Sequence, residues 1–170
     1  PGEIERISAG EIGDLYEGAS RPSHFTGVLT VVKRLFDLVK PKSAVFGEKD
    51  FQQLFLIKQM INQLGLPIEI ISAPTIREKN GLAISSRNIR LDKSGEKTSE
   101  VIYKALTMPT IEQMKSEILN EPGFKLDYLE IINEATFQKA EPDTQNKRVI
   151  IAGWVNDLRL IDNMPMGIRK

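Results

Sequence analysis

The sequence predicts an α/β fold in which a parallel, layered part up to about residue 76 is followed by a smaller α+β part. Two observations support this prediction. Over residues 26–74, segments with helical apolar spacing alternate with short apolar runs, which is typical of a parallel sheet covered by helices. Residues 124–137 and 147–164 instead alternate apolar and polar side chains, as half-exposed antiparallel strands do.

The segment before Pro41 predicts two helices. A short helix is expected over residues 8–18, opened by Ser8 and closed near Gly18. A longer helix is expected over residues 26–40, because Pro41 cannot continue it. Its apolar residues recur at helical spacing and form a wide stripe, as expected for a helix that packs against a sheet. The members of this stripe are Val28, Val31, Val32, Leu35, Phe36, Leu38 and Val39.

A strand, a helix and a second strand are expected next. SAVFG, residues 43–47, is short and apolar and predicts a buried strand. Residues 50–65 predict a helix, with Asp50 as its N-cap and Gly65 as its C-cap. The isoleucine-rich run 66–74 predicts the second strand.

The remaining chain begins with a polar stretch, residues 75–97, which predicts an extended loop because it has no long apolar stripe. Helices are expected over residues 98–106 and 110–119. The two alternating segments, residues 124–137 and 147–164, then complete the α+β part. Two such parts side by side commonly bind a small ligand between them.

The composition excludes several functional classes. Lys+Arg and Asp+Glu both number 23, so no excess of cations is available for binding a nucleic acid. The chain has no cysteine, which excludes disulfides and thiolate metal sites and suits the cytoplasm. Its one histidine, His24, cannot form a histidine-rich metal site, and we expect a structural role for it. No apolar run approaches the roughly 18 residues that a membrane span needs.

The stretch FGEKDFQQL follows the first predicted strand, at the edge where ligands bind in open α/β sheets. Gly47 would let a ligand approach the backbone, and Lys49 would add positive charge near the first amides of the next helix. Asp50 could accept hydrogen bonds from the two hydroxyls of a ribose or hold a divalent ion, and Gln53 lies one turn further on. The alternative is an ordinary turn with a capping Asp50 and a solvated Glu48–Lys49 pair.

The stretch REKNGLAISSRN lies in the predicted loop and carries a second candidate site. Ser85, Ser86 and Arg87 place two hydroxyls and a guanidinium in sequence, a set that suits phosphate oxygens. Arg77 and Lys79 are expected to strengthen the positive field there. The alternative is a polar surface loop.

Three residues near the end of the chain are expected to be structural. Trp154 lies in an alternating segment and is expected to pack in the core. Arg159 and Asp162, in RLIDN, are expected to form a salt link or a turn.

Four motifs in order, EGASRPSHFTGVLTVVKRLF, FGEKDFQQL, REKNGLAISSRN and RLIDN, resemble those of the pantothenate synthetase (pantoate–β-alanine ligase) family. The resemblance covers nearly all of the chain. It implies that residues 1–76 are the second half of a nucleotidyltransferase-type Rossmann fold and that residues 77–170 are a small α+β lid domain with antiparallel strands. Family members condense pantoate with β-alanine to give pantothenate, a coenzyme A precursor. They use ATP and Mg²⁺, form a pantoyl adenylate, and are commonly homodimers.

The resemblance also implies roles for individual residues. Gly47 and Asp50 would hold the ribose of ATP, the backbone near Ile76 would read the adenine edge, and Gln53 would bind pantoate. Lys49 and the loop Ile84–Arg87, which resembles the KMSKS segment of class I aminoacyl-tRNA synthetases, would meet the phosphates. The residues expected to bind ATP are Gly47, Glu48, Lys49, Asp50, Ile76, Ile84, Ser85, Ser86 and Arg87. Those expected to act in catalysis are Lys49, Ser85, Ser86 and Arg87. No metal-ligating side chains are expected.

The chain departs from the family at its start. Family members carry an amino-terminal half with a HIGH-like segment of two histidines and a pantoate-binding glutamine, whereas His24 belongs to a different motif. The chain therefore resembles the carboxy-terminal part of a longer enzyme, and we expect it to be inactive alone. Two alternatives remain: a module that folds or associates without turnover, and a related adenylate-forming ligase or nucleotidyltransferase for another acid. Membranes and nucleic acids are not expected as partners.

Overall fold

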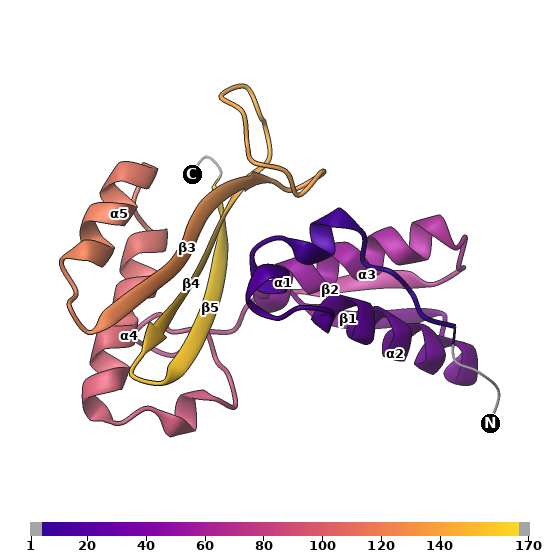
Figure 1. Ribbon diagram of the computed structural model, residues 1–170, viewed down its shortest axis with the longest axis horizontal. Helices are drawn as coiled ribbons and strands as arrows, with labels where there is room; N and C mark the ends of the chain where they lie inside the picture. The colour runs from indigo at the N-terminus through magenta and orange to yellow at the C-terminus, as the bar shows by residue number, and fades with distance from the viewer. Residues whose placement is uncertain (1–4, 167–170) are drawn as a thin grey trace. The chain divides into compact units, whose positions relative to one another are not determined.

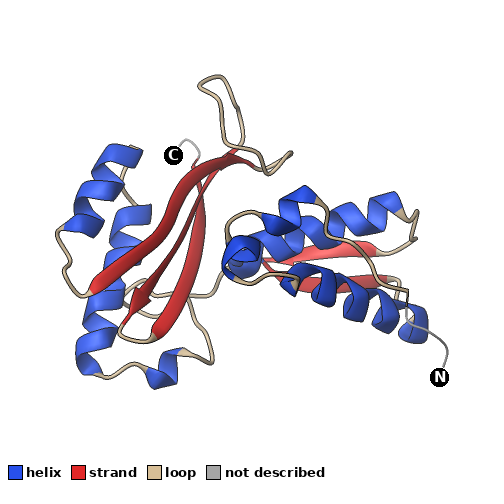
Figure 2. Ribbon diagram, viewed as in Figure 1, coloured by secondary structure: helices blue, strands red, loops and turns tan. Residues whose placement is uncertain are grey.

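The structure is a computed structural model that describes residues 5–166, and the chain divides into two compact units, Pro1–Pro74 and Thr75–Lys170. The first unit contains a parallel pair of strands, and the second contains three antiparallel strands with helices (Figures 1 and 2). The predicted α/β class, with a parallel part followed by an antiparallel α+β part, is confirmed.

The sheet of the first unit joins β1 (Ser43–Gly47) to β2 (Glu69–Ala73) in parallel. Ser43 lies opposite Glu69 and Gly47 opposite Ala73, so the carboxyl ends of both strands reach the same edge. The connection between them is α3 (Phe51–Gln63), and α2 (His24–Val39) precedes β1. Both strands lie where the sequence predicts them, but β1 is not the buried strand that was expected, since Val45 is 64% exposed.

The core of the first unit lies between its two long helices and one face of the sheet. Successive strand residues point to opposite faces, so Ala44, Phe46 and Ile70 face the helices. The rings of Phe36 in α2 and Phe46 in β1 meet edge to face, with centroids 6.4 Å apart. The buried members of this core are Ala9, Phe25, Leu29, Phe36, Leu56, Ile57, Met60 and Ile61.

Both long helices end in backbone conformations that the sequence indicates. After α2, Lys40 adopts a left-handed conformation with φ 49°, and Pro41 follows. After α3, Gly65 has φ 58°, and the Leu66 amide donates to the Ile61 carbonyl at 3.0 Å. This bond is typical of a glycine-terminated helix, so the predicted role of Gly65 is confirmed.

The predicted apolar stripe of α2 is wrong for most of its members, because Phe36 is the only one of the seven that is buried. Phe25, Leu29 and Phe36 form the buried row, whereas Val31 is 59% exposed and Leu35 is 52% exposed. The helix is apolar on two sides, and helical spacing alone does not distinguish the side that meets the sheet.

The predicted helix over residues 8–18 is also wrong as a single element. Two short turns, η1 (Glu11–Asp14) and α1 (Glu17–Ser20), replace it, and Leu15 between them is extended. Gly18 packs so closely on the Gly13 carbonyl that any Cβ there would overlap it. The glycines therefore fold the segment back on itself.

The second unit packs two helices on one face of an antiparallel sheet. The strand order is β3 (Phe124–Asn133), β4 (Lys147–Val155), β5 (Leu158–Met166). The helices are α4 (Lys93–Leu106) and α5 (Ile111–Leu119). The core between the helices and the sheet includes Ile102, Ala105, Met114, Ile118, Val149, Ile151 and Val155.

Helix α4 begins earlier than predicted, within the segment expected to be a loop. Asp92 caps the helix, because its Oδ1 accepts the Gly95 amide at 2.7 Å. A short 3-10 turn, η3 (Asn88–Arg90), precedes this cap. The first turn contains Gly95 and no apolar side chain, so the apolar pattern did not indicate where the helix begins.

Two predictions about strand side chains are wrong for a single geometric reason. Trp154 is 38% exposed, because it points away from the face that carries Val149, Ile151 and Val155. Arg159 does not pair with Asp162, since residues three apart in a strand lie on opposite faces. Arg159 Nη2 instead lies 2.6 Å from Asp127 Oδ2, and Asp162 pairs with Arg77.

Candidate functional site

The carboxyl edge of the parallel sheet leads directly into the first candidate site. Gly47 ends β1 there, and η2 (Glu48–Asp50) turns the chain into α3. Gly47 has an ordinary φ of −73°, and no atom lies within 4 Å of the position that a Cβ would take. The space beside Gly47 is therefore open, as close approach of a ligand to the backbone requires.

Asp50 occupies the N-cap position of α3, as predicted, but its side chain makes no capping hydrogen bond. The carboxylate is thus not used to satisfy the first amides of the helix. Glu48, Lys49 and Asp50 follow one another in the 3-10 turn η2, next to these amides. The corner, defined as Gly47 to Asp50, combines a cation, carboxylates and helix amides at one edge of the sheet.

Two neighbouring glutamines in α3 have different surroundings. Gln52 is 5% exposed, its Nε2 donates to the carbonyls of Ile12 and Leu15 at 2.7 and 2.9 Å, and its Oε1 accepts the Glu17 amide. Gln52 thereby holds the glycine-rich segment of η1 and α1 against α3. The side chain of Gln53 is half-buried and makes no hydrogen bond within residues 5–166.

We expect Gln52→Leu to lower the free energy of unfolding by about 2–3 kcal/mol, because it leaves several buried backbone groups unpaired. Gln53→Leu is the matched control and should change stability by less than about 0.5 kcal/mol. Urea unfolding followed by circular dichroism measures both. Equal stabilities of the two variants would contradict the structural role of Gln52.

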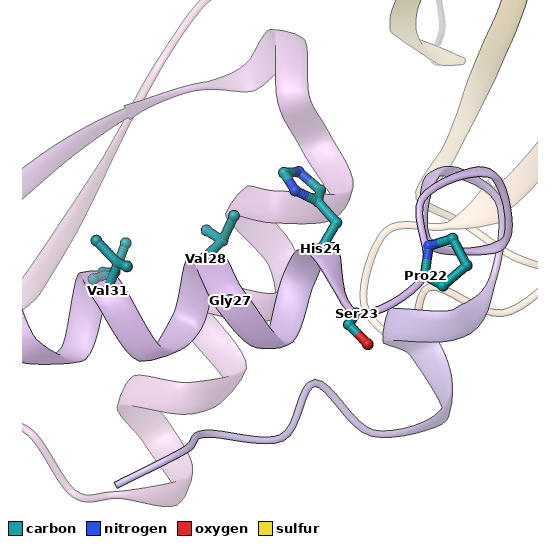
Figure 3. A pocket seen from close by; sticks show the side chains of 7 residues that line it. Pro22, Ser23, His24, Gly27, Val28 and Val31 are labelled. Atoms are coloured by element: carbon teal, nitrogen blue, oxygen red, sulfur yellow. The ribbon is translucent and has the colours of Figure 1, made fainter. Parts of the chain in front are cut away.

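A depression of about 550 Å³ lies at the amino end of α2 (Figure 3). His24, Val28 and Val31 project from the helix into it, so its wall is largely apolar. The His24 ring lies 5.1 Å from the Phe25 ring. The sequence prediction assigned Val28 and Val31 to a buried stripe and therefore missed this depression; the other lining residues are Pro22, Ser23, Gly27 and Val32.

The second candidate site lies at the open end of a hairpin in the second unit, away from the turn at Asn80 and Gly81. The Ile84 amide donates to the Ile76 carbonyl at 2.9 Å, and the Glu78 amide donates to Leu82 at 2.8 Å. These bonds bring Ile76 and Ile84 side by side, and both side chains are exposed. Residues 84–87 continue from this hairpin as a turn that ends at η3.

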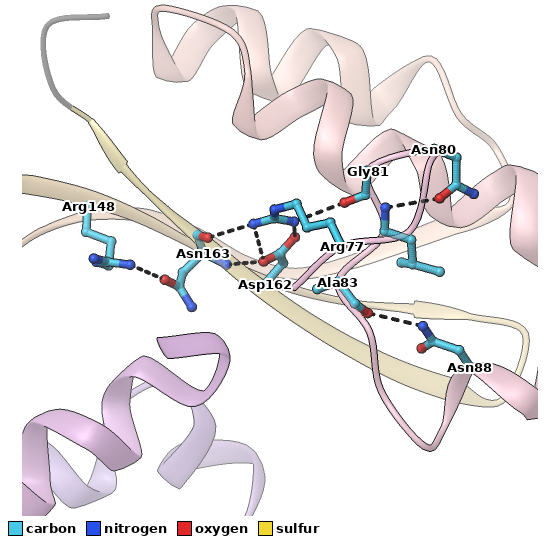
Figure 4. Close-up of polar contacts among 9 residues, drawn as sticks. Arg77, Asn80, Gly81, Ala83, Asn88, Arg148, Asp162 and Asn163 are labelled. Atoms are coloured by element: carbon cyan, nitrogen blue, oxygen red, sulfur yellow. Dashed lines mark hydrogen bonds and ion pairs between the residues drawn. The ribbon is translucent and has the colours of Figure 1, made fainter. Parts of the chain in front are cut away.

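Arg77 does not contribute free positive charge, contrary to the prediction. Its guanidinium forms two bonds to the Asp162 carboxylate, at 2.5 and 3.0 Å, and the Asp162 side chain is only 2% exposed (Figure 4). The charge of Arg77 is therefore balanced within the protein. Lys79 and Arg87 are exposed and supply the positive charge of this region.

The predicted site residues fall into two groups, one on each unit. Gly47, Glu48, Lys49, Asp50 and Gln53 belong to the first unit. Ile76 and the loop Ile84–Arg87 belong to the second.

Residues 5–166 contain no group of three or more His, Asp or Glu side chains placed to hold a metal ion. None of the helices in that range is long and apolar enough to cross a membrane.

The chain is similar to one family over nearly its whole length. The family Pantoate-beta-alanine ligase matches residues 3–165. The pantothenate synthetase of Acidothermus cellulolyticus is 44% identical over 176 residues, which cover 95% of this chain and 58% of that protein.

Solved structures give the same result. The crystal structure of pantothenate synthetase from Thermus thermophilus matches with a TM-score of 0.92 and 38% identity, over 98% of this chain and 64% of that one. A pantoate-beta-alanine ligase from Francisella tularensis, complexed with Beta-gamma ATP and Beta-alanine, matches with a TM-score of 0.76 and 36% identity, over 96% and 59%. The chain spans about three fifths of the length of these relatives. It belongs to the pantoate-beta-alanine ligase family.

Proposed function

We propose that the chain is the carboxy-terminal part of a pantothenate synthetase, which condenses pantoate with β-alanine at the expense of ATP. Family membership over residues 3–165 and four motifs in order support this function. The structure of the Francisella tularensis relative is a complex with Beta-gamma ATP and Beta-alanine. In this proposal residues 1–76 belong to the nucleotide-binding domain and residues 77–170 form the lid.

The observation that carries the proposal is that two polar segments, the corner and the loop Ile84–Arg87, each present groups that could contact a ligand. The corner, Gly47 to Asp50, has open space beside its glycine and a carboxylate that does not cap its helix. The loop Ile84–Arg87 has exposed Ser86 and Arg87 side chains. We propose that Asp50 and Gly47 hold the ribose, that the backbone near Ile76 reads the adenine, and that Glu48 lies beside the nucleotide.

The chemistry asks the protein chiefly for positioning and for positive charge. A carboxylate oxygen of pantoate, bound by Gln53, attacks the α-phosphorus of ATP, and the bond from that phosphorus to the bridging oxygen breaks. Pyrophosphate leaves with its electron pair and extra negative charge. The amine of β-alanine then attacks the acyl carbon, AMP leaves, and the amine loses a proton.

Fixed cations stabilise the charge that develops on the departing pyrophosphate. We assign this role to Lys49 and Arg87, assisted by hydroxyl donors from Ser85 and Ser86. Since the described residues hold no carboxylate cluster for a metal, Mg²⁺ would arrive with ATP, held mainly by phosphate oxygens and water.

The sheet of the first unit has one uncovered face, and this bears on activity. Val45 is 64% exposed and Ile71 is 42% exposed, both on the face away from α2 and α3. Parallel sheets are normally covered on both faces. We therefore propose that further family sequence completes the domain, and we expect little turnover from the chain alone.

The test is ATP–pyrophosphate exchange, measured with and without pantoate. We compare the chain alone with a chimera, defined as the amino-terminal part of Thermus thermophilus pantothenate synthetase joined to residues 1–170 of this chain. The chimera should catalyse exchange that requires pantoate, and the chain alone should give little.

Other outcomes separate the alternatives. Exchange supported by another acid and not by pantoate would favour a related adenylate-forming enzyme. Absence of exchange in the chimera, with the Thermus thermophilus enzyme active in the same assay, would favour a module without turnover.

We also propose that the complete enzyme works in the cytoplasm as a homodimer. The absence of cysteine suits a reducing compartment. The exposed row Val31, Leu35 and Leu38 on α2 is apolar enough to lie in an interface between copies. Sedimentation of the chimera measures its oligomeric state.

A further inference from the structure

The loop Ile84–Arg87 has a tip with free side chains and a backbone with internal bonds. Ser86 and Arg87 side chains are exposed and form no hydrogen bond or ion pair within residues 5–166. The backbone is tied, since the Arg87 amide donates to Ser85 Oγ at 3.2 Å and the Asn88 amide donates to the Ser85 carbonyl at 3.0 Å. The hydrogen bonds that fix the loop backbone therefore do not use the Ser86 and Arg87 side chains.

Asn88 closes this loop from its far end. Its Nδ2 donates to the Ala83 carbonyl at 3.1 Å, as Figure 4 shows. Ala83 immediately precedes Ile84, and Asn88 immediately follows Arg87. One side-chain hydrogen bond therefore spans the four loop residues and holds the two ends together.

A buried network fixes the near end of the loop to the sheet. Arg77 donates to the Gly81 carbonyl at 3.0 Å and to the Asn163 carbonyl at 3.2 Å, in addition to its two bonds to Asp162 in β5 (Figure 4). Arg77 also lies over the Tyr103 ring of α4, 5.2 Å from the centroid. Ala83 pairs with Arg77 in the hairpin, so the acceptor of Asn88 is itself anchored.

The Asn88 side chain is oriented unambiguously by these contacts. Because a carbonyl oxygen only accepts, the atom that faces Ala83 must be the amide nitrogen. The other atom, Oδ1, is buried and has no partner within the described residues. The amide group therefore contributes to the loop through its donor.

We propose that Asn88 is a positioning residue that holds Ser85, Ser86 and Arg87 in the arrangement that receives a triphosphate. The inference rests on the proposed use of ATP by this loop and adds a residue that touches no phosphate. A loop held in place before binding loses less conformational entropy when the ligand arrives. Binding groups also need support to stay in a productive geometry.

The variant that tests this is Asn88→Asp, which keeps the shape of the side chain and removes the donor to Ala83. Asn80→Asp is the control in the same hairpin, because it keeps the Oδ1 that accepts the Leu82 amide at 3.2 Å and loses only an exposed contact of 3.5 Å from Nδ2 to Glu100. Both variants add one negative charge. Asn88→Leu removes the donor without adding charge, so a deficit that Asn88→Asp and Asn88→Leu share reports the lost bond to Ala83 rather than the added charge.

The first measurement is amide hydrogen exchange of the 170-residue chain without ATP. Loss of one such bond should speed exchange at the Arg87 and Asn88 amides by about tenfold in Asn88→Asp relative to Asn80→Asp. Protection in α4 and β5 should be unchanged. Equal protection of the loop in both variants, or a loss of protection spread over the whole second unit, would overturn the proposal.

Low pH should reduce the loss of loop protection in Asn88→Asp. A carboxyl becomes a donor when it is protonated and can bond to Ala83 again. Burial and the facing carbonyl oxygen should raise the pKa of this carboxyl above the ordinary value of about 3.9. The deficit of Asn88→Asp relative to Asn80→Asp should therefore shrink as the pH falls to about 4. A deficit that stays constant over this range would contradict the donor role.

The second measurement is ATP binding by calorimetry to the chimera, without substitution and with each of the two substitutions. The Kd for Mg-ATP should rise about tenfold in Asn88→Asp and stay within about twofold in Asn80→Asp, with equal melting temperatures. Equal Kd values in the two variants would overturn the positioning role. Failure of the unaltered chimera to bind ATP would count against the proposed function, whereas the amide hydrogen exchange experiment would still decide whether Asn88 holds the loop.

Discussion

Replacing Lys49 by alanine should lower pantoate-dependent ATP–pyrophosphate exchange in the chimera by about 100- to 1000-fold, because a fixed charge near the departing pyrophosphate is lost. Lys49 lies in η2, directly after the carboxyl edge of β1. The neighbouring helix amides attract the same anion, so a smaller residual rate should persist. The loss should appear in kcat more than in the KM for pantoate.

Lys42→Ala is the matched control, because Lys42 is exposed and precedes β1 at the opposite edge of the sheet. Its exchange rate should stay within about twofold of the unaltered chimera, since surface substitutions rarely change stability by more than about 0.5 kcal/mol. Equal rates for Lys49→Ala and Lys42→Ala would remove Lys49 from the mechanism.

Replacing Arg87 by alanine should have an effect of similar size, about 100-fold or more on kcat/KM for ATP. The guanidinium is permanently charged and can bond two phosphate oxygens at once. Arg87→Lys keeps the charge and loses the fork, so it should fall between Arg87→Ala and the unaltered chimera. Pyrophosphate exchange at varied ATP concentration measures all three.

Arg90→Ala serves as the control for the loop. Arg90 is exposed and lies in η3, three residues after Arg87, so the same charge is removed nearby. We expect near-normal exchange from it. If both variants lost activity equally, general electrostatic attraction of ATP would explain the effect, and the specific role of Arg87 would be wrong.

Local patterns predicted the fold well where one signal dominated. Helix α3 and strand β1 lie where spacing and caps placed them, and Gly65 ends its helix as expected. The same reasoning failed for α2, because an apolar side such as Val31 and Leu35 looks identical whether it is buried or exposed. Only the tertiary packing of Phe25 and Phe36 decides which side faces the sheet.

Some errors could have been avoided from the sequence, and others could not. The odd spacing of Arg159 and Asp162 already excludes their pairing within one strand. The actual partner of Asp162 is Arg77, 85 residues away, and no local pattern connects the two. Contacts between residues so far apart in the sequence are set by the tertiary fold.

The motifs predicted which segments carry the candidate site, and the structure shows that neighbouring residues of the same type within them have different roles. Gln52 and Gln53 are identical in type and adjacent in sequence, yet only Gln52 is buried with backbone partners. Likewise, Arg77 and Arg87 both lie near the loop, but Arg77 is neutralised by Asp162. Burial and hydrogen-bond partners make these distinctions, and neither is visible in a single sequence.

The most direct test of the account is a crystal structure of the chimera with a non-hydrolysable ATP analogue and Mg²⁺. The account predicts that Lys49 Nζ and the Arg87 guanidinium both lie within about 3 Å of oxygens of the same triphosphate. A triphosphate that contacts only one of the two residues, or a nucleotide bound away from both, would contradict it.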